Sequence, residues 1–233
     1  INDYILYCFQ TPNDMMVKTL IYDLETSGFC PLPLTSKYHN VLQICAHCVE
    51  TGETFTAFVK PQLAMVPTQS EAIHKISDDC VRDADDFTTV VNKMFETLGC
   101  DLEMDIIEMI AHNNDKFDEV LFRSLYANTL PETVTFWDTL PFLRLKYPRL
   151  TSYNLGKVYF HFYNTNFQNA HRADADVFAL ARIYKEKVQP FRKTFQRDED
   201  VERIVKECLT SIHYIGPYRA ELITKCTGAE TVS

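Results

Sequence analysis

The chain has 233 residues, of which 46% are hydrophobic, enough for one substantial core with a small appendage. Its formal net charge of −9 argues against indiscriminate binding to polyanions, and no apolar run approaches the roughly 20 residues that a membrane span needs. The N-terminus lacks the order of basic, apolar and small residues typical of a secretory signal, so we expect an intracellular protein, cytoplasmic or nuclear, without a membrane anchor.

The first part of the chain predicts three strands. Residues 1–15 contain a turn-like stretch and are interpreted as a peripheral extension. The β-rich apolar run at 17–25 is typical of a buried strand. Residues 40–50 and 54–61 predict a hairpin with Gly52 in its turn.

The cysteines are expected to be reduced thiols. All eight are scattered through segments that otherwise resemble core, in a chain too large to need disulfide bonds. Cys45 and Cys48 form a CxxC inside a strand-like run, but the sequence has no second CxxC or Cys/His pair at zinc-ligand spacing. This pattern favours two buried small apolar side chains over a zinc site.

After residue 85, helices alternate with strands. Asp86 can cap a helix that runs to about Leu98 and ends at Gly99. Two strands are expected at 105–113 and 133–140, with helices at 117–128, 139–146, 151–160 and 172–188, the last closed by Pro190. This order predicts an α/β fold, a mixed five-stranded sheet with helices on both faces whose later strands run parallel to the first.

The C-terminal part is expected to be a small helical extension. Residues 190–200 have little apolar periodicity and are interpreted as a linker, and residues 201–233 as a helical hairpin. From Arg182 to Lys225 there are ten Lys and Arg against seven Asp and Glu, so the basic surface is concentrated here. A mixed charged helix face is usually solvated, and by itself this composition says little about nucleic acid.

Acidic residues gather near the ends of the expected strands. Asp23 and Glu25 follow an apolar run and are separated by a single residue, so strand alternation puts both side chains on one face. Their charges repel each other there, unless the face is exposed to solvent or holds a cation. Asp118 lies where a strand meets a helix, and His171 and Asp176 lie at the start of another helix. Because sites collect at the strand ends of α/β sheets, we expect these side chains to meet at one edge.

Three segments resemble the motifs of the DEDDh (DnaQ-like) 3′–5′ exonucleases. They are "YDLETSG" with Asp23 and Glu25, "AHNNDKFD" with Asp118, and "HRADAD" with His171 and Asp176. The similarity spans roughly residues 17–188 and implies a ribonuclease-H-like exonuclease domain at 16–189.

Within that family the chain looks most similar to the three-prime repair exonucleases. Three residues separate "AHN" from "FD", as in their second motif, and "SYNLGKVYFHFY" resembles another of their segments. The chain departs from that subgroup in its short region between the second and third motifs and in lacking a hydrophobic C-terminal anchor. The subgroup also suggests a homodimer formed through the edge strand "TFTAFVK".

The resemblance implies a two-metal phosphodiesterase site with Mg²⁺, for which Mn²⁺ can substitute. Asp23 would bridge both ions, Glu25 and Asp176 would complete the site of the attacking water, and Asp118 would hold the second ion mainly through water. His171 would be the general base. Asp115 competes with Asp118, and Asp174 with Asp176; the neighbouring Phe117 and the spacing from His171 favour Asp118 and Asp176.

Further residues are assigned to substrate by the same resemblance. Asn113, Thr26 and the backbone around Leu24 would contact the 3′-terminal nucleotide. His74 either packs under the sheet or touches the substrate. His112 and Asp138 are interpreted as structural.

The C-terminal hairpin resembles a helix-hairpin-helix motif. Ile215-Gly216-Pro217 lies between two helical patterns, and Gly216 and Arg219 would face DNA phosphates. The family's usual second glycine is replaced by Tyr214, so an ordinary helical hairpin packed on the core stays open.

The sequence thus predicts a metal-dependent 3′–5′ exonuclease that releases nucleoside 5′-monophosphates, with DNA favoured over RNA. The alternatives are an exoribonuclease on the same scaffold and a nucleic-acid-binding scaffold with weak activity.

Overall fold

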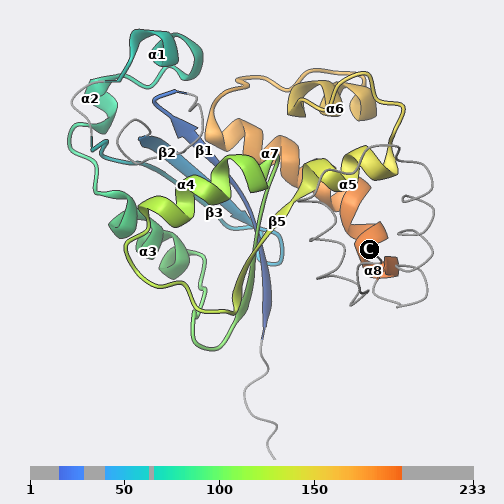
Figure 1. Ribbon diagram of the computed structural model, residues 1–233, viewed down its shortest axis with the longest axis horizontal. Coiled ribbons are helices and arrows are strands. Elements are labelled where there is room, and N and C mark those ends of the chain that lie inside the picture. The colour runs from blue at the N-terminus through green and yellow to red at the C-terminus, as the bar shows by residue number, and fades with distance from the viewer. Residues whose placement is uncertain (1–15, 29–39, 63–65, 196–233) are drawn as a thin grey trace, which may run out of the picture.

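The computed structural model describes residues 16–28, 40–62 and 66–195. Its centre is a five-stranded sheet in the order β3-β2-β1-β4-β5 (Figure 1). The strands are β1 (Val17–Thr26), β2 (Val41–Cys48), β3 (Thr54–Phe58), β4 (Ile106–Ala111) and β5 (Val134–Asp138). β2 runs antiparallel to β1 and β3, whereas β4 and β5 run parallel to β1, so the predicted mixed sheet is confirmed.

Helices cover both faces of this sheet. Up to residue 183 the described helices are α1 (Thr68–His74), α2 (Asp78–Val81), α3 (Phe87–Thr97), the 3₁₀ turn η1 (Asn114–Lys116), α4 (Asp118–Leu125), α5 (Thr139–Lys146), α6 (Leu155–Tyr163) and α7 (Ala173–Ile183). The apolar faces of α3 and α4 pack on one side of the sheet, and those of α5, α6 and α7 on the other (Figure 1). The sequence did not predict α1, α2 or η1, each of which is too short for helical periodicity to be visible.

Alternation along β1 divides its side chains between the two cores. Tyr22 and Leu24 point into the core under α3 and α4, whereas Ile21 points into the core under α7. Asp23 and Glu25 continue the row of Ile21 and therefore face α7. Both carboxylates thus share one face of the strand, as predicted.

The CxxC is split by the same alternation. Cys45 belongs to the core under α7, and Cys48 to the core under α3 and α4. Two thiols on opposite faces of one strand cannot share a zinc ion. The structure therefore agrees with the interpretation of Cys45 and Cys48 as buried small apolar side chains. The four described cysteines are free.

The last helix does not end at Pro190, which corrects the expected linker. α7 continues through a π-helical turn, η2 (Tyr184–Val188), into α8 (Gln189–Phe195), so residues 190–195 are helical. The N–H of Gln189 bonds to the carbonyl of Tyr184, five residues back. This wider turn lies where Pro190 would otherwise clash with the helix and remove a hydrogen bond. Residues 196–200 and the expected hairpin at 201–233 lie outside the described residues.

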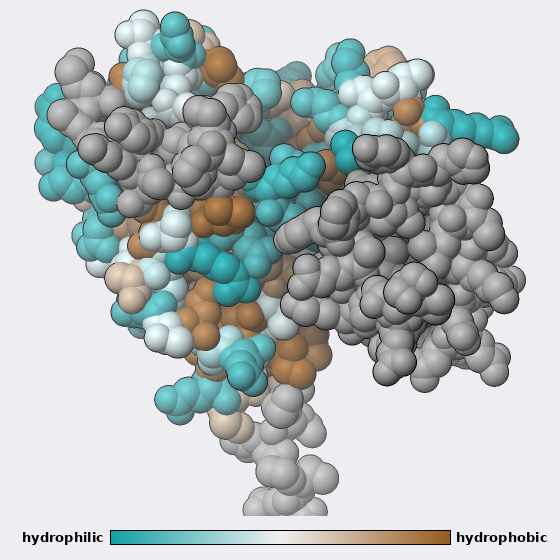
Figure 2. All heavy atoms as spheres, in the orientation of Figure 1, coloured by the Kyte–Doolittle hydropathy of each residue, from teal (hydrophilic) through white to brown (hydrophobic). Residues whose placement is uncertain are grey.

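Large apolar side chains are exposed at several places on the sheet and on the helices. On the face drawn in Figure 2, hydrophilic and apolar side chains are mixed over the described residues, and apolar residues gather below α4. Met16, Val17 and Met104, at the amino ends of β1 and β4, are among the exposed large apolar residues. None of the helices in the described ranges combines the length and the apolarity needed to cross a membrane.

Candidate active site

Three carboxylates converge where the carboxyl end of β1 meets α7. Asp23 and Glu25 project from β1, and Asp176 projects from the first turns of α7, which packs across β1 and β2. One carboxylate oxygen of each residue lies within 4.8 Å of the others. The competing Asp174 is held outside this group, because both its oxygens accept from Arg172 at 3.1 Å.

Asp118 reaches the same place from the other side of the sheet. It is the first residue of α4 and is only 3% exposed. Its Oδ1 accepts a hydrogen bond from the backbone N–H of Leu24, between Asp23 and Glu25, at 3.2 Å. Asp115 is exposed on the preceding 3₁₀ turn. The structure therefore places Asp118, and not Asp115, beside the three converging carboxylates.

Burial and neighbouring acids raise the pKa of all four carboxyl groups. Burial is the largest cause in each case, and it raises the pKa of Glu25 to about 7, of Asp118 to about 8 and of Asp176 to about 6. The pKa of Asp23 is raised well above its ordinary value, by burial and then by Asp118, Asp176 and Glu25. This cluster is costly to ionise in the absence of a cation.

His171 stands next to the cluster. It precedes α7 with a left-handed φ of 70°, and its backbone N–H donates to Oδ2 of Asp176 at 3.0 Å. His171 is an exposed residue. The ring is therefore free to approach a group bound at the carboxylates.

The four acids suit hard divalent cations. No ion pair in the described ranges joins Asp23, Glu25, Asp118 or Asp176 to a lysine or arginine. Carboxylate oxygens are the ligands that Mg²⁺ prefers, and a bound cation would offset the repulsion that raises their pKa values. An all-oxygen donor set that no lysine or arginine of the described residues neutralises therefore fits Mg²⁺ or Mn²⁺.

The residues expected to bind substrate surround this edge of the sheet. Thr26 is buried at the end of β1 and donates through Oγ1 to the carbonyl of Gly28 at 3.2 Å. Asn113 follows β4 in a left-handed conformation, with φ of 66°. The Leu24 N–H, part of the backbone expected to contact the nucleotide, is occupied by Asp118. Gly216 and Arg219 lie outside the described residues.

His74 is packed at the end of α1. The residue is 4% exposed, and its Nδ1 accepts from the N–H of Ile76 at 3.0 Å. Its Nε2 has no hydrogen-bond partner within the described ranges, and burial lowers the pKa of the ring. α1 is tied to β1 because Ser70 Oγ donates to the Ser27 carbonyl at 2.6 Å.

His112 and Asp138 hold the loop that carries Asn113. The two ring nitrogens of His112 are 2.9 Å from Thr139 Oγ1 and 2.7 Å from the carbonyl of Tyr153. Asp138 Oδ1 accepts from the N–H groups of Asn113 and Leu140, both at 2.8 Å. These contacts fix the loop, and the assignment of both residues to a structural role stays a prediction.

One buried residue of this loop was missed. Asn114 occupies a spacer position of the second motif, yet it is fully buried and hydrogen-bonded to two strands. A polar residue in a spacer gives no periodic signal, so the sequence offered no reason to single it out.

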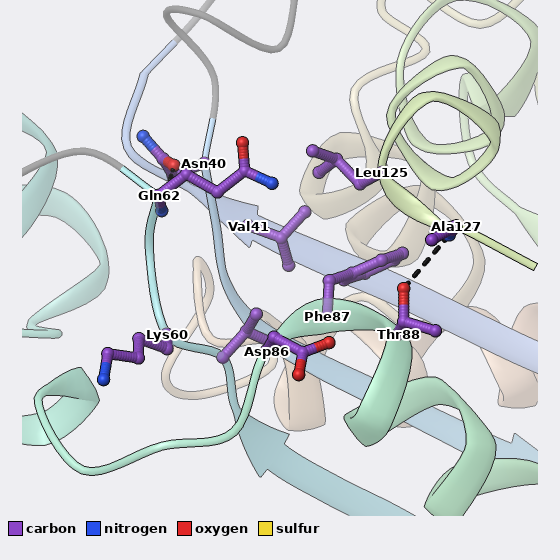
Figure 3. A pocket seen from close by; sticks show the side chains of 10 residues that line it. Asn40, Val41, Lys60, Gln62, Asp86, Phe87, Thr88, Leu125 and Ala127 are labelled. Atoms are coloured by element: carbon purple, nitrogen blue, oxygen red, sulfur yellow. Dashed lines mark hydrogen bonds between the residues drawn. The ribbon is translucent and has the colours of Figure 1, made fainter.

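A separate pocket of about 220 Å³ opens on the other face of the sheet (Figure 3). Apolar residues such as Val41, Phe87 and Leu125 line it together with polar ones. Two of its polar side chains are engaged within the fold: Asp86 caps α3 through Thr89, and Thr88 Oγ1 accepts from the N–H of Ala127 (Figure 3). None of the converging carboxylates lines this pocket.

A mixed five-stranded sheet with an acid cluster at the carboxyl end of its first strand defines a nuclease of ribonuclease-H-like fold. A family model described as exonuclease, RNase_T, matches residues 20–184. The chain belongs to this exonuclease family, whose members with these motifs are the DEDDh 3′–5′ exonucleases.

Curated relatives come from bacterial DNA polymerases. The chain is 28% identical over 170 residues to the PolC-type DNA polymerase III of Bacillus subtilis, covering 70% of this chain and 11% of that protein. It is 25% identical over 177 residues to the DNA polymerase III epsilon subunit of Buchnera aphidicola, covering 72% of this chain and 69% of that one. The chain thus spans about a tenth of the first relative.

Solved structures share the fold at low sequence identity. A 3′-exonuclease described with a histone mRNA stem-loop has a TM-score of 0.58 at 16% identity, over 74% of this chain and 64% of that one. Escherichia coli ExoI, described with single-stranded DNA, has a TM-score of 0.56 at 18% identity, over 81% of this chain and 45% of that one.

Proposed function

We propose that this protein is a metal-dependent 3′–5′ exonuclease that removes nucleoside 5′-monophosphates from the 3′ ends of DNA. The observation that carries the proposal is the approach of Asp23, Glu25 and Asp176 within 4.8 Å, with Asp118 bonded to the backbone between the first two. Such a cluster holds together at neutral pH if cations occupy it.

The four acids would hold two Mg²⁺ ions, for which Mn²⁺ can substitute. When bound, the pair lowers the pKa of water and offsets charge on the attacking and leaving oxygens. Asp23 would bridge the two positions, Glu25 and Asp176 would complete one of them, and Asp118 would serve the other through water.

His171 would accept the proton of the attacking water. An imidazole can do so near neutral pH, and this ring is exposed beside Asp176. Asn113, Thr26 and the backbone near Leu24 would orient the terminal nucleotide. His74 would contribute through its Nε2, which is buried without a partner in the described part of the chain.

DNA is the proposed substrate. The curated relatives are named as DNA polymerases, and two of the solved neighbours are described with DNA. A helix-hairpin-helix-like tail with Gly216 and Arg219 would add contacts to DNA phosphates. The resemblance to three-prime repair exonucleases also supports DNA as the substrate. The neighbour described with histone mRNA supports the alternative, an exoribonuclease.

The test is release of label from matched DNA and RNA strands. With Mg²⁺, a 3′-labelled DNA should lose its label first and a 5′-labelled copy should shorten step by step, and chelator should stop both. Asp23→Asn should abolish release, whereas Asp83→Asn, an exposed acid outside the cluster, should not. Faster loss of label from RNA than from DNA would make RNA the substrate in place of DNA. Release of label by Asp23→Asn would refute the metal-dependent mechanism.

Two further proposals concern the oligomeric state and the cellular location of the protein. β3 is one of the two edge strands of the sheet, with Phe58 39% exposed, which supports pairing with a second copy of the chain. Light scattering should give the mass of a dimer, and Phe58→Lys should reduce it to that of a monomer. The free thiols of the described cysteines support an intracellular location.

A further inference from the structure

Two buried side chains link β1 to β5 beneath the candidate active site. The hydroxyl of Tyr22, on β1, donates to Oδ1 of Asn114 at 2.5 Å. The amide Nδ2 of Asn114 donates in turn to the carbonyl of Trp137, on β5, at 3.1 Å. Because β4 lies between β1 and β5, Asn114 bridges the sheet across the carboxyl end of β4.

This bridge connects the segments that carry two of the four acids. Tyr22 immediately precedes Asp23, and Asn114 lies four residues before Asp118 on the intervening 3₁₀ turn. The ring of Tyr22 also packs edge-on against Phe122, one helical turn after Asp118, with centroids 5.9 Å apart. A shift of either partner would therefore move Asp118 relative to Asp23.

The chemistry of the pair is specific to a tyrosine and an amide. Both residues are fully buried, so neither finds water if its partner is lost. A tyrosine hydroxyl, whose ordinary pKa is about 10, is protonated at neutral pH and can donate. Asn114 must accept at one end and donate at the other, which a carboxylate in its place could not do.

We propose that Tyr22 and Asn114 are positioning residues that set the separation of Asp118 from Asp23 and thereby the affinity of the site for divalent cations. The inference rests on the proposed function, because it assumes that cations bind at these acids. Groups that orient metal ligands without touching the metal typically change metal affinity by about 10–100-fold when they are removed.

The experiment compares two tyrosine-to-phenylalanine variants. Tyr22→Phe keeps the ring and removes the donor to Asn114. Tyr126→Phe removes a tyrosine-to-asparagine bond at the rim of the same core, because the Tyr126 hydroxyl donates to Oδ1 of the exposed Asn92 at 2.8 Å. Mn²⁺ binding to the full chain is measured by calorimetry, well below the unfolding temperature of each variant.

We expect Tyr22→Phe to weaken Mn²⁺ binding about tenfold and Tyr126→Phe to leave it within about twofold. Asn114→Ala should weaken it similarly, and the double variant no more than either single one, because both break one bridge. If Asn114→Ala does not fold, Tyr22→Phe alone decides. Equal affinities for Tyr22→Phe and the parent protein, or equal losses in both tyrosine variants, would overturn the proposal.

Activity separates this inference from the proposed function. A parent protein that binds Mn²⁺ but releases no nucleotide, with weaker binding in Tyr22→Phe, would refute the exonuclease and support the positioning role. A parent protein that degrades DNA, with unchanged Mn²⁺ binding in Tyr22→Phe, would support the exonuclease and refute the positioning role.

Discussion

The backbone N–H of Leu24 donates to the side chain of Asp118 across 94 positions of sequence. This bond ties the start of α4 to the strand residue between Asp23 and Glu25. It brings a fourth acid to a place where three already repel one another, and it lowers the pKa of Asp118 against the larger effect of burial. The bond therefore offsets part of the cost of assembling the site.

Asp118→Asn should stabilise the protein without metal and inactivate it with metal. The amide oxygen can still accept from Leu24, while a buried charge disappears. At pH 8 in chelator we expect a gain on the order of 1 kcal/mol, or about 2–4 °C in Tm for a domain of this size. Nuclease activity should fall at least about 10²-fold, since a metal-holding charge is gone.

Asp118→Ala is the matched control for this pair. It removes the same charge but leaves the buried Leu24 N–H without an acceptor, which costs about 1–3 kcal/mol. Thermal unfolding in chelator should rank the asparagine variant above the alanine variant. Identical Tm values would mean that the Leu24 bond contributes nothing to stability.

The stability of the metal-free protein should fall as pH rises through neutrality. The folded-state pKa values of Asp176, Glu25 and Asp118 are raised to about 6, 7 and 8. The folded protein therefore retains protons that the unfolded chain has already lost, and its free energy of unfolding decreases as pH rises from about 4 through about 8.

Excess Mg²⁺ should cancel this decrease, because the bound cation favours the ionised acids. Unfolding curves between pH 5 and pH 9, with chelator and with Mg²⁺, check the prediction. Glu25→Gln should flatten the chelator curve. A metal-free Tm that rises over this range would contradict the raised pKa values.

His171→Gln should separate chemistry from metal binding. Loss of a general base typically lowers kcat by about 10²–10⁴-fold. Mn²⁺ affinity should persist, because the contact between His171 and Asp176 is made by the backbone N–H. Single-turnover rates and calorimetry give the two quantities. His161→Gln, an exposed histidine on α6, should retain the full rate, and an equal loss there would argue against a specific role for His171.

Arg192→Leu should show that α8 is part of the folded domain. Arg192 reaches both oxygens of Glu108, on β4, and lies 4.2 Å from the ring of Trp137. The two side chains of the ion pair are 26% and 20% exposed, so its loss should cost about 1–3 kcal/mol in the free energy of unfolding.

The control for Arg192 is an exposed pair of the same kind. Arg82 bonds to Asp79 with both side chains largely exposed, and Arg82→Leu should cost less than about 1 kcal/mol. Denaturant unfolding measures both variants. Equal costs would mean that α8 is held no more firmly than a surface turn.

Local pattern was enough to predict the sheet and most of its helices. Alternation with period two put Asp23 and Glu25 on one face whatever packs there, and caps such as Asp86 set helix starts from neighbouring residues. The missed elements are short, and the wrong helix end at Pro190 came from treating proline as a stop. A π-helical turn accommodates it, and the contact of Arg192 with Glu108 holds the continued helix in place.

By itself, the sequence determined which residue types are available for chemistry and which strand face the first pair occupies, because these depend on neighbours along the chain. Only the tertiary structure decided that Asp176 joins the cluster, that Leu24 holds Asp118, and that Tyr22 reaches Asn114. The reason is physical: burial, repulsion and hydrogen bonding depend on distances between side chains far apart in sequence, which the packing of helices on the sheet sets.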